Sequence, residues 1–361
     1  MNDPALLMPE DLADYAGISL ARLVKYANDT SLLYKERRTK VIKGKARPID
    51  PPTLFFKHMG KKLHRFLSRN YSLHHSVHGG AIGRSCFTAA ARHIKRTYVI
   101  TRDIAQCYPS IHKDALFEQL LNYGFNTVTA GLLSRLFLRE NQVAQGSPLS
   151  TDALNFFFYS FDGKMTKICR RYGGRITRTY DDIVISTNDL DASQFLANSL
   201  EQEIASYGLK VNQKKKADNG FQSLDSRYLP RVHKLILDPK KGVTIPLKQK
   251  QKAVKQAEAY LRGCKCISPD SLEGVARRRQ IVMGHVNHMR QARSSNVKHV
   301  YKLIKQGDGL VHHLLICNKI EHKRKWWLIT ENGRSSYNEP KRIADIWRSA
   351  FMPEGHGLEI F

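Results

Sequence analysis

Two adjacent carboxylates, Asp181 and Asp182, stand between two strand-forming runs and constrain the fold more than any other feature of the chain. The flanking runs 175–177 and 183–185 contain mostly β-branched residues, which indicates the two arms of a hairpin. Neighbouring residues of an extended strand point to opposite faces, so both carboxylates serve one site only if the chain turns sharply there. A turn carrying this pair can hold a divalent metal ion. Because Asp also favours ordinary turns, the pair alone is weak evidence.

Length and charge narrow the class of protein. A chain of 361 residues accommodates one large enzyme with several subdomains or two ordinary domains. Apolar residues make up 42%, which excludes global disorder. Lysine and arginine number 59 against 32 acidic residues, and the excess is spread along the chain, which indicates a polyanion bound over an extended surface. A ribosome-associated or membrane-surface protein could share this charge, but neither class explains the carboxylates.

The cysteines and the apolar runs indicate where in the cell the protein is located. Of six cysteines, only Cys264 and Cys266 lie close together, and no second pair completes a zinc site, so we expect free thiols in a reducing cytoplasm. There is no signal peptide and no apolar run of about 20 residues. We therefore expect a cytoplasmic protein without a membrane partner.

The central part of the chain alternates helices and strands. A buried strand over 98–104 ends in Asp103, and a Gln-Gly-Ser-Pro loop opens a long apolar helix. The alternation predicts an α+β fold with helices packed on one face of a sheet. The other elements that we expect here are helices over 114–123, 129–140, 151–171 and 192–207 and a strand over 208–212.

The N-terminal part is basic. The segment up to about residue 45 reads as helical and then densely charged, and a strand over 46–49 precedes a helix that runs to about Tyr71. Lys57, Lys61 and Arg65 recur every four residues of this helix and so share one face. This face is either a solvated surface or a contact to nucleic-acid phosphates.

Four short motifs occur in a fixed order. The first runs from Asp103 to Tyr108, the second from Gln145 to Ser150 with Asn155 behind it, and the third is the Asp-Asp pair. The fourth, 208–215, contains an Asn-x-x-Lys pattern. Together they resemble the palm of reverse transcriptases, and the resemblance covers roughly residues 40 to 290.

The resemblance implies a right-hand polymerase with fingers, a palm made of an antiparallel sheet backed by helices, and a helical thumb. It also implies limits for the parts of the chain. We expect an N-terminal basic helical segment over 1–45, fingers over 46–98, a palm over 99–220 with a fingers insertion at about 112–144, a primer-grip hairpin and thumb over 221–295, and a C-terminal extension over 296–361.

The chemistry implied is nucleotide transfer. Joining a nucleotide to a 3′-hydroxyl is an in-line phosphoryl displacement, and two Mg²⁺ ions about 4 Å apart can stabilise the attacking and leaving oxygens. Mg²⁺ prefers carboxylate oxygens and substrate phosphates. We expect Asp103 and Asp181 as the main ligands, Asp182 as a supporting ligand and the Ile104 carbonyl as a further one, with Mn²⁺ as an alternative metal.

The resemblance also assigns residues around the nucleotide. Tyr108 stands where the family places an aromatic ring beneath the sugar, where it would clash with a 2′-hydroxyl and favour dNTPs. Gln145 would line the same pocket. Arg47 and Arg84 resemble fingers residues that hold the triphosphate, a role suited to guanidinium groups.

Further basic residues would act on the leaving group and the duplex. Lys215 would neutralise or protonate the leaving pyrophosphate, with Lys214 and Lys216 as rivals for that role. Two basic helices expected over 247–261 and 274–293 would track the template-primer duplex. Their candidate residues are Lys248, Lys252, Lys255, Arg277 and Arg278.

Two details bear on the subclass. The fingers segment 77–93 resembles bacterial retron-type enzymes, but Val232, His233 and Lys234 stand where retrons commonly carry Val-Thr-Gly. The usual third motif also has Tyr where this chain has Thr179. With no Cys/His cluster after the thumb, a group II intron protein is disfavoured, and we expect a defence-associated or abortive-infection enzyme.

The resulting prediction is a reverse transcriptase of an anti-phage defence system that uses dNTPs to copy a dedicated noncoding RNA into DNA. Alternatives are a retron enzyme making multicopy single-stranded DNA, a template-independent or protein-primed DNA polymerase, an RNA-dependent RNA polymerase, and a non-catalytic nucleic-acid-binding scaffold. A homo-oligomer or a companion defence protein are the protein partners considered.

Overall fold

The structure is a computed structural model that describes residues 3–42, 44–224, 228–266, 272–292, 294 and 296–310. The chain divides into two compact units, Met1–Val243 and Thr244–Phe361. The subdomain limits expected from the sequence remain predictions, and residues 311–361 of the expected C-terminal extension lie outside the described residues.

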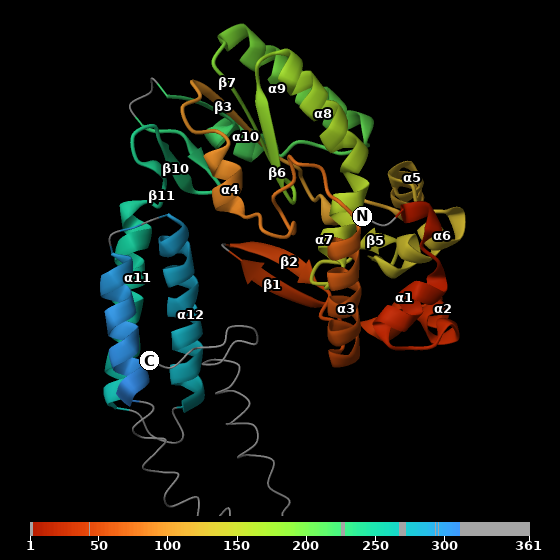
Figure 1. The fold of residues 1–361 in the computed structure, drawn as a ribbon, viewed down its shortest axis with the longest axis horizontal. Coiled ribbons are helices and arrows are strands. Elements are labelled where there is room, and N and C mark those ends of the chain that lie inside the picture. The colour runs from red at the N-terminus through yellow and green to blue at the C-terminus, as the bar shows by residue number, and fades with distance from the viewer. Residues whose placement is uncertain are drawn as a thin grey trace, which may run out of the picture. The chain divides into compact units, whose positions relative to one another are not determined.

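A four-stranded antiparallel sheet forms the centre of the first unit. Its strands are ordered β6-β7-β3-β8. Helices α8 and α9 lie together on one face of the sheet, where α8 packs on β6 and α9 packs on β7 and β3 (Figure 1). The α+β prediction is therefore confirmed. The elements are β3 (Tyr98–Asp103), β6 (Arg175–Thr179), β7 (Asp182–Thr187), β8 (Phe221–Ser223), α8 (Tyr159–Arg171) and α9 (Leu190–Ser206).

A second layer of helices completes the core of this unit. Helix α5 packs on α6 and α7, and the N-terminal helices α1 and α2 pack on α3 and α6. The aromatic run Phe156, Phe157 and Phe158 is buried in the shared hydrophobic cluster. These helices are α1 (Pro9–Ala16), α2 (Leu20–Asn28), α3 (Leu54–Asn70), α5 (Lys113–Tyr123), α6 (Thr127–Leu136) and α7 (Ser150–Phe157), while the short α4 (Cys86–Ala91) contacts β6.

The basic part of the N-terminal segment is not helical, contrary to expectation. Residues 38–42 form strand β1 (Arg38–Ile42), which pairs antiparallel with β2 (Lys45–Ile49). Thr39, Val41 and Ile42 are β-branched and favour a strand, so their preference prevails over the helical pattern of the preceding residues.

Three other expected elements also differ. The helix expected to reach Glu140 ends at Leu136, because Glu140 and Asn141 adopt positive φ angles of 51° and 61° in the turn of a small hairpin, β4 (Leu138–Arg139) and β5 (Gln142–Val143). Positive φ at both turn residues is typical of two-residue hairpin loops. The long helix is interrupted once, at Phe158, and the expected strand 208–212 is reduced to one bridge, between Ile104 and Val211.

A small antiparallel sheet and a helical unit follow. The sheet has the order β11-β10-β9 and contains β9 (Arg231–Val232), β10 (Leu235–Asp238) and β11 (Gly242–Thr244). In the second unit, α11 (Leu247–Lys265) packs against α12 (Leu272–Gln291). Asp308 joins them by accepting hydrogen bonds from Tyr260 at 2.6 Å and Arg279 at 2.8 Å.

Two expectations about the surface and thiols can be compared with the described residues. None of the helices described is both long and apolar enough to cross a bilayer. The five cysteines within the described ranges are all unpaired thiols, and Cys317 lies outside these ranges.

Candidate active site

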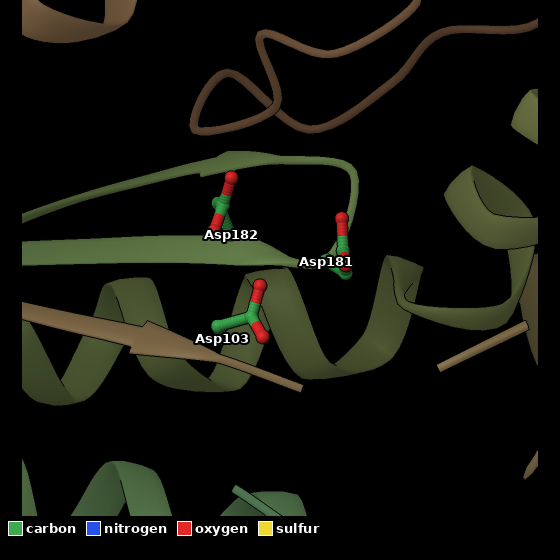
Figure 2. A group of neighbouring side chains, drawn as sticks. All are labelled: Asp103, Asp181 and Asp182. Atoms are coloured by element: carbon green, nitrogen blue, oxygen red, sulfur yellow. The ribbon is translucent and has the colours of Figure 1, made fainter. Parts of the chain in front are cut away.

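Three carboxylates from distant parts of the sequence meet at one end of the central sheet. The antiparallel register of β3 and β7 places Asp103 directly opposite Asp182. Thr179 pairs with Asp182 across the hairpin, so Asp181 lies in its two-residue loop. One oxygen of each of the three carboxylates lies within 4.8 Å of the others, and Figure 2 shows the three side chains gathered at this place. The structure therefore brings together all three predicted acidic residues.

The hairpin turn explains how adjacent residues face the same site. Tyr180 has a φ of 58°, in the left-handed region that few non-glycine residues adopt. The Ile104 amide donates to the Asp181 carbonyl at 3.1 Å, which joins the turn to the end of β3. Asp181 thus leaves the regular alternation of the strand, and its carboxylate can share a site with that of Asp103.

Two of the three carboxylates have raised pKa values. Burial and the nearby Asp103 raise the pKa of Asp181. Partial burial, opposed by Lys215 and reinforced by Asp181, raises the pKa of Asp182 to about 7. Carboxylates so close together favour a proton or a cation in their midst.

The donor set fits a divalent metal. All three groups offer oxygen, the ligand that Mg²⁺ and Mn²⁺ prefer, and within the described part of the chain no His or Cys belongs to this cluster. Burial and then mutual repulsion raise the two pKa values, and a bound dication would offset the repulsion. These three residues are therefore suited to hold a divalent metal ion.

The fourth motif engages Asp103 directly. The Lys215 ammonium contacts one oxygen of Asp103 and lies 3.5 Å from Asp182 Oδ1, while Asn212 Nδ2 donates to the other oxygen of Asp103 at 2.9 Å. Burial acts to lower the pKa of Lys215, but the carboxylates outweigh it and raise that pKa, so the group is a cation. Of the rivals to Lys215, Lys216 binds Glu201 at 2.7 Å and Lys214 is exposed.

The residues expected around the nucleotide lie at varied depth. Tyr108 begins a 3-10 turn and is half-buried; burial, and then Asp181, raise its pKa. Arg47 is exposed on β2, and its charge acts to lower the pKa of Asp181. Gln145 is half-buried, and its carbonyl accepts from the Asp50 amide at 2.7 Å. These three residues therefore belong to the surroundings of the carboxylates or to the loop that opens α7.

Arg84 has a function that the sequence did not indicate. Its Nη1 donates to the carbonyls of His74 at 2.8 Å and Val77 at 2.7 Å. Arg84 therefore holds together the two ends of the loop that precedes α4. Ile104, whose carbonyl is expected as a metal ligand, is buried and forms an isolated antiparallel β-bridge with Val211.

The candidate nucleic-acid contacts are all exposed. Lys57, Lys61 and Arg65 share the solvent face of α3, whose opposite face is buried. In the second unit the exposed candidates lie on α11 and α12; they are Lys248, Lys252, Lys255, Arg277 and Arg278.

Two features near the carboxylates were missed from the sequence. His233 and Lys234 form a tight turn with φ angles of 51° and 65°, and His233 Nδ1 lies 4.0 Å from Asp182 Oδ2. Arg178 and Asp162 form a fully buried ion pair beneath the Asp-Asp hairpin. No pattern in the sequence distinguishes these two residues from the other charged residues of β6 and α8.

Comparison with known proteins agrees with this geometry. The family described as reverse transcriptase (RNA-dependent DNA polymerase) matches residues 34–221. The Retron Se72 reverse transcriptase of Salmonella heidelberg (strain 579083-10) is 27% identical over 213 residues, which cover 57% of this chain and 56% of that enzyme. The Retron Mx65 reverse transcriptase of Myxococcus xanthus is 23% identical over 308 residues, which cover 77% of this chain and 72% of that one.

A solved structure with similarity is a telomerase from Candida albicans in complex with a fragment of telomeric RNA, with a TM-score of 0.44 and 12% identity over 91% of this chain and 66% of that one. The assignment rests on the sequence matches instead. The chain belongs to the reverse transcriptase (RNA-dependent DNA polymerase) family, which confirms the resemblance seen in the four motifs. Its curated relatives make it retron-like, although the match spans little more than half of the Se72 enzyme.

Proposed function

We propose that this protein is an RNA-directed DNA polymerase that adds dNTPs to a primer 3′ end. The observation that carries the proposal is the register of β3 and β7, which sets Asp103 opposite Asp182 with Asp181 in the adjoining loop. In a chain of this family, three clustered carboxylates support nucleotide transfer better than a purely structural role.

In the proposed mechanism, Asp103, Asp181 and Asp182 hold the metal, with the Ile104 carbonyl as a further ligand. When bound, two divalent ions, Mg²⁺ or Mn²⁺, supply stabilisation of the negative charge on the attacking and leaving oxygens. The chain contributes the orientation of these carboxylates and a cation, Lys215, at their edge. After the nucleotide arrives, we expect this ammonium to act on the leaving pyrophosphate.

Other residues of the first unit would bind and select the nucleotide. Arg47, whose charge reaches Asp181, is suited to contact the triphosphate, and Arg84 and Gln145 would complete the pocket. Tyr108 would exclude a 2′-hydroxyl. Changing Tyr108→Ala should raise the ratio of NTP to dNTP incorporation by at least about tenfold, because a clash worth about 1.4 kcal/mol would be relieved. An unchanged ratio would remove Tyr108 from the pocket.

For substrates and partners, we propose a noncoding RNA template and a DNA product in a bacterial defence system. The retron names of the relatives and the net charge of +27 support this assignment. Exposed lysines and arginines on α3, α11 and α12 would contact the backbone phosphates. A cytoplasmic location, a homo-oligomer and a companion defence protein remain predictions from the sequence.

The test is incorporation of labelled dNTPs by purified protein on a primed RNA template with Mg²⁺. We expect extension with dNTPs, little with NTPs, and none with the double variant Asp181→Ala, Asp182→Ala. Preferential use of NTPs would indicate an RNA polymerase. If the double variant keeps its biological activity against phage, the protein acts as a scaffold and the proposal is wrong.

A further inference from the structure

Beneath the Asp-Asp hairpin lies an ion pair that is fully shielded from water. Arg178 of β6 and Asp162 of α8 both have 0% side-chain exposure. Arg178 Nε donates to Asp162 Oδ1 at 2.9 Å, and Nη2 donates to Oδ2 at 2.7 Å. The guanidinium also lies 4.9 Å from the centre of the Phe158 ring. Both charges are therefore matched inside the protein.

The same guanidinium reaches the loop that carries Asp181. Its Nη1 donates to the Tyr180 carbonyl at 3.0 Å, and Nη2 donates to Asn155 Oδ1 at 3.3 Å. Asn155 in turn donates to the Gly79 carbonyl at 3.0 Å. One side chain thus joins the hairpin loop to two helices and, through Asn155, to the segment before α4.

The backbone of Arg178 is held as well. Its amide donates to Ser76 at 2.9 Å, and its carbonyl accepts from the His78 amide at 2.8 Å. Gly79 then passes so close that an added Cβ would lie 2.6 Å from the Tyr180 nitrogen. The loop therefore has no room to shift toward this segment.

Stability of the fold does not by itself explain why a buried ion pair is present at Arg178 and Asp162. Replacing a buried ion pair by apolar residues of similar volume is often neutral or stabilising, whereas removing one partner leaves an uncompensated buried charge. The loop, however, needs support, because Tyr180 holds a left-handed conformation that persists only where surrounding contacts impose it. The contact from Arg178 to the Tyr180 carbonyl provides such support.

We propose that Arg178, oriented by Asp162 and Asn155, is a positioning residue that fixes the Tyr180 carbonyl and thereby aims the Asp181 carboxylate at Asp103. This inference rests on the proposed function, since it assigns a metal-binding purpose to the carboxylates. Because the Arg178 side chain is fully buried, we expect it to touch neither nucleotide nor metal. Its effect passes through one peptide unit to the neighbouring Asp181.

The test is a double variant, Arg178→Met with Asp162→Leu, which removes both charges and keeps the volume. We expect its melting temperature to stay near that of the wild type, while its affinity for Mn²⁺, measured without substrate, falls about 10–100-fold, the range for groups that orient metal ligands. Wild-type Mn²⁺ affinity in a folded double variant would show that the pair serves folding alone and would overturn the inference.

A second variant covers the case in which the double variant does not fold. Arg178→Lys keeps a cation beside Asp162, but one ammonium cannot reproduce the fixed fork that reaches Asp162 and Tyr180 together. We expect a folded protein whose Mn²⁺ affinity is at least about tenfold weaker. An unchanged affinity would contradict the inference.

A matched control uses another Arg–Asp pair, Arg279 and Asp308, which lies in the second unit. Arg279→Met with Asp308→Leu should leave Mn²⁺ affinity unchanged. The Mn²⁺ readout also separates the two proposals. If wild-type protein binds Mn²⁺ but extends no primer, the proposed function fails, and a loss of affinity in the Arg178 variants still supports the positioning role.

Discussion

The two sides of the carboxylate cluster are built in opposite ways. On the Asp181 side, the supporting ion pair of Arg178 and Asp162 is fully buried. On the Asp103 side, the cation is Lys215, whose side chain is 54% exposed. A buried pair is costly to break, whereas an exposed ion pair contributes about 0–1 kcal/mol and exchanges easily. The comparison shows that the Arg178–Asp162 pair fixes the geometry on the Asp181 side. On the Asp103 side, Lys215 can leave Asp103 when a metal ion and a nucleotide bind.

The largest expected effect is on the carboxylates that both sides serve. Asp181→Asn or Asp103→Asn should reduce primer extension by on the order of 10³-fold or more, or about 4 kcal/mol of transition-state stabilisation. The measurement is the extension rate at saturating dNTP. Asp114→Asn, an exposed change in the same unit, is the control and should be neutral. Near-normal extension rates in both active-site variants would show that Asp103 and Asp181 do not form a catalytic centre.

The next prediction compares how much Arg178 and Lys215 contribute to the free energy of unfolding. Arg178→Met alone should lower the free energy of unfolding by about 3–5 kcal/mol, because Asp162 is left as a buried, unpaired charge. Lys215→Met should change it by less than about 1 kcal/mol, because the Lys215 side chain is 54% exposed. Denaturant titration of both variants measures the difference. Equal losses would abolish the distinction between a fixed and an exchangeable side.

Lys215 should matter more for activity than for stability. Lys215→Met should slow primer extension by about 10²-fold if the ammonium assists the leaving group. In the absence of substrate, it should strengthen Mn²⁺ binding, because a cation that contacts Asp103 and lies near Asp182 has been removed. Lys214→Met, its exposed neighbour, is the control. Weaker Mn²⁺ binding in the Lys215 variant would show that the lysine helps to hold the metal instead.

The last expected effect is a pH dependence of the stability of the metal-free protein. The pKa of Asp182 is about 7 in the folded chain, against an ordinary value of 3.8. The folded state therefore binds more protons than the unfolded state between about pH 4 and 7, and the free energy of unfolding should fall as the pH rises through this window. Denaturant titrations at pH 5 and pH 8 with chelator measure this fall, and Asp182→Asn should reduce it. The same slope in the variant would exclude Asp182 as its source.

Short-range patterns made much of this site predictable. The hairpin arms, the strand that ends at Asp103 and the helix that follows the second motif depend on the residues within each segment, and all three are present in the structure. The family resemblance came from the order of the same motifs. Where local preferences competed, as in 38–42 and at the end of α6, the predicted element was wrong, because strand pairing and a hairpin turn prevailed there.

Contacts between distant segments that lie outside the family motifs could not be predicted from the sequence. The pairing of Arg178 with Asp162 depends on how β6 packs on α8, and neither residue belongs to a motif that the sequence marks. The approach of His233 to Asp182 likewise depends on where the hairpin of β9 and β10 lies. Periodicity reports which face of an element is buried, but it does not report which buried groups meet.

The most direct test of the account is a crystal structure of the protein with Mn²⁺, located by its anomalous scattering. We predict Mn²⁺ between Asp103 and Asp181, the Lys215 ammonium displaced from Asp103, and the contacts of Arg178 with Asp162 and Tyr180 unchanged. Mn²⁺ bound away from these carboxylates, or a rearranged Arg178 beside an unmoved Lys215, would contradict it.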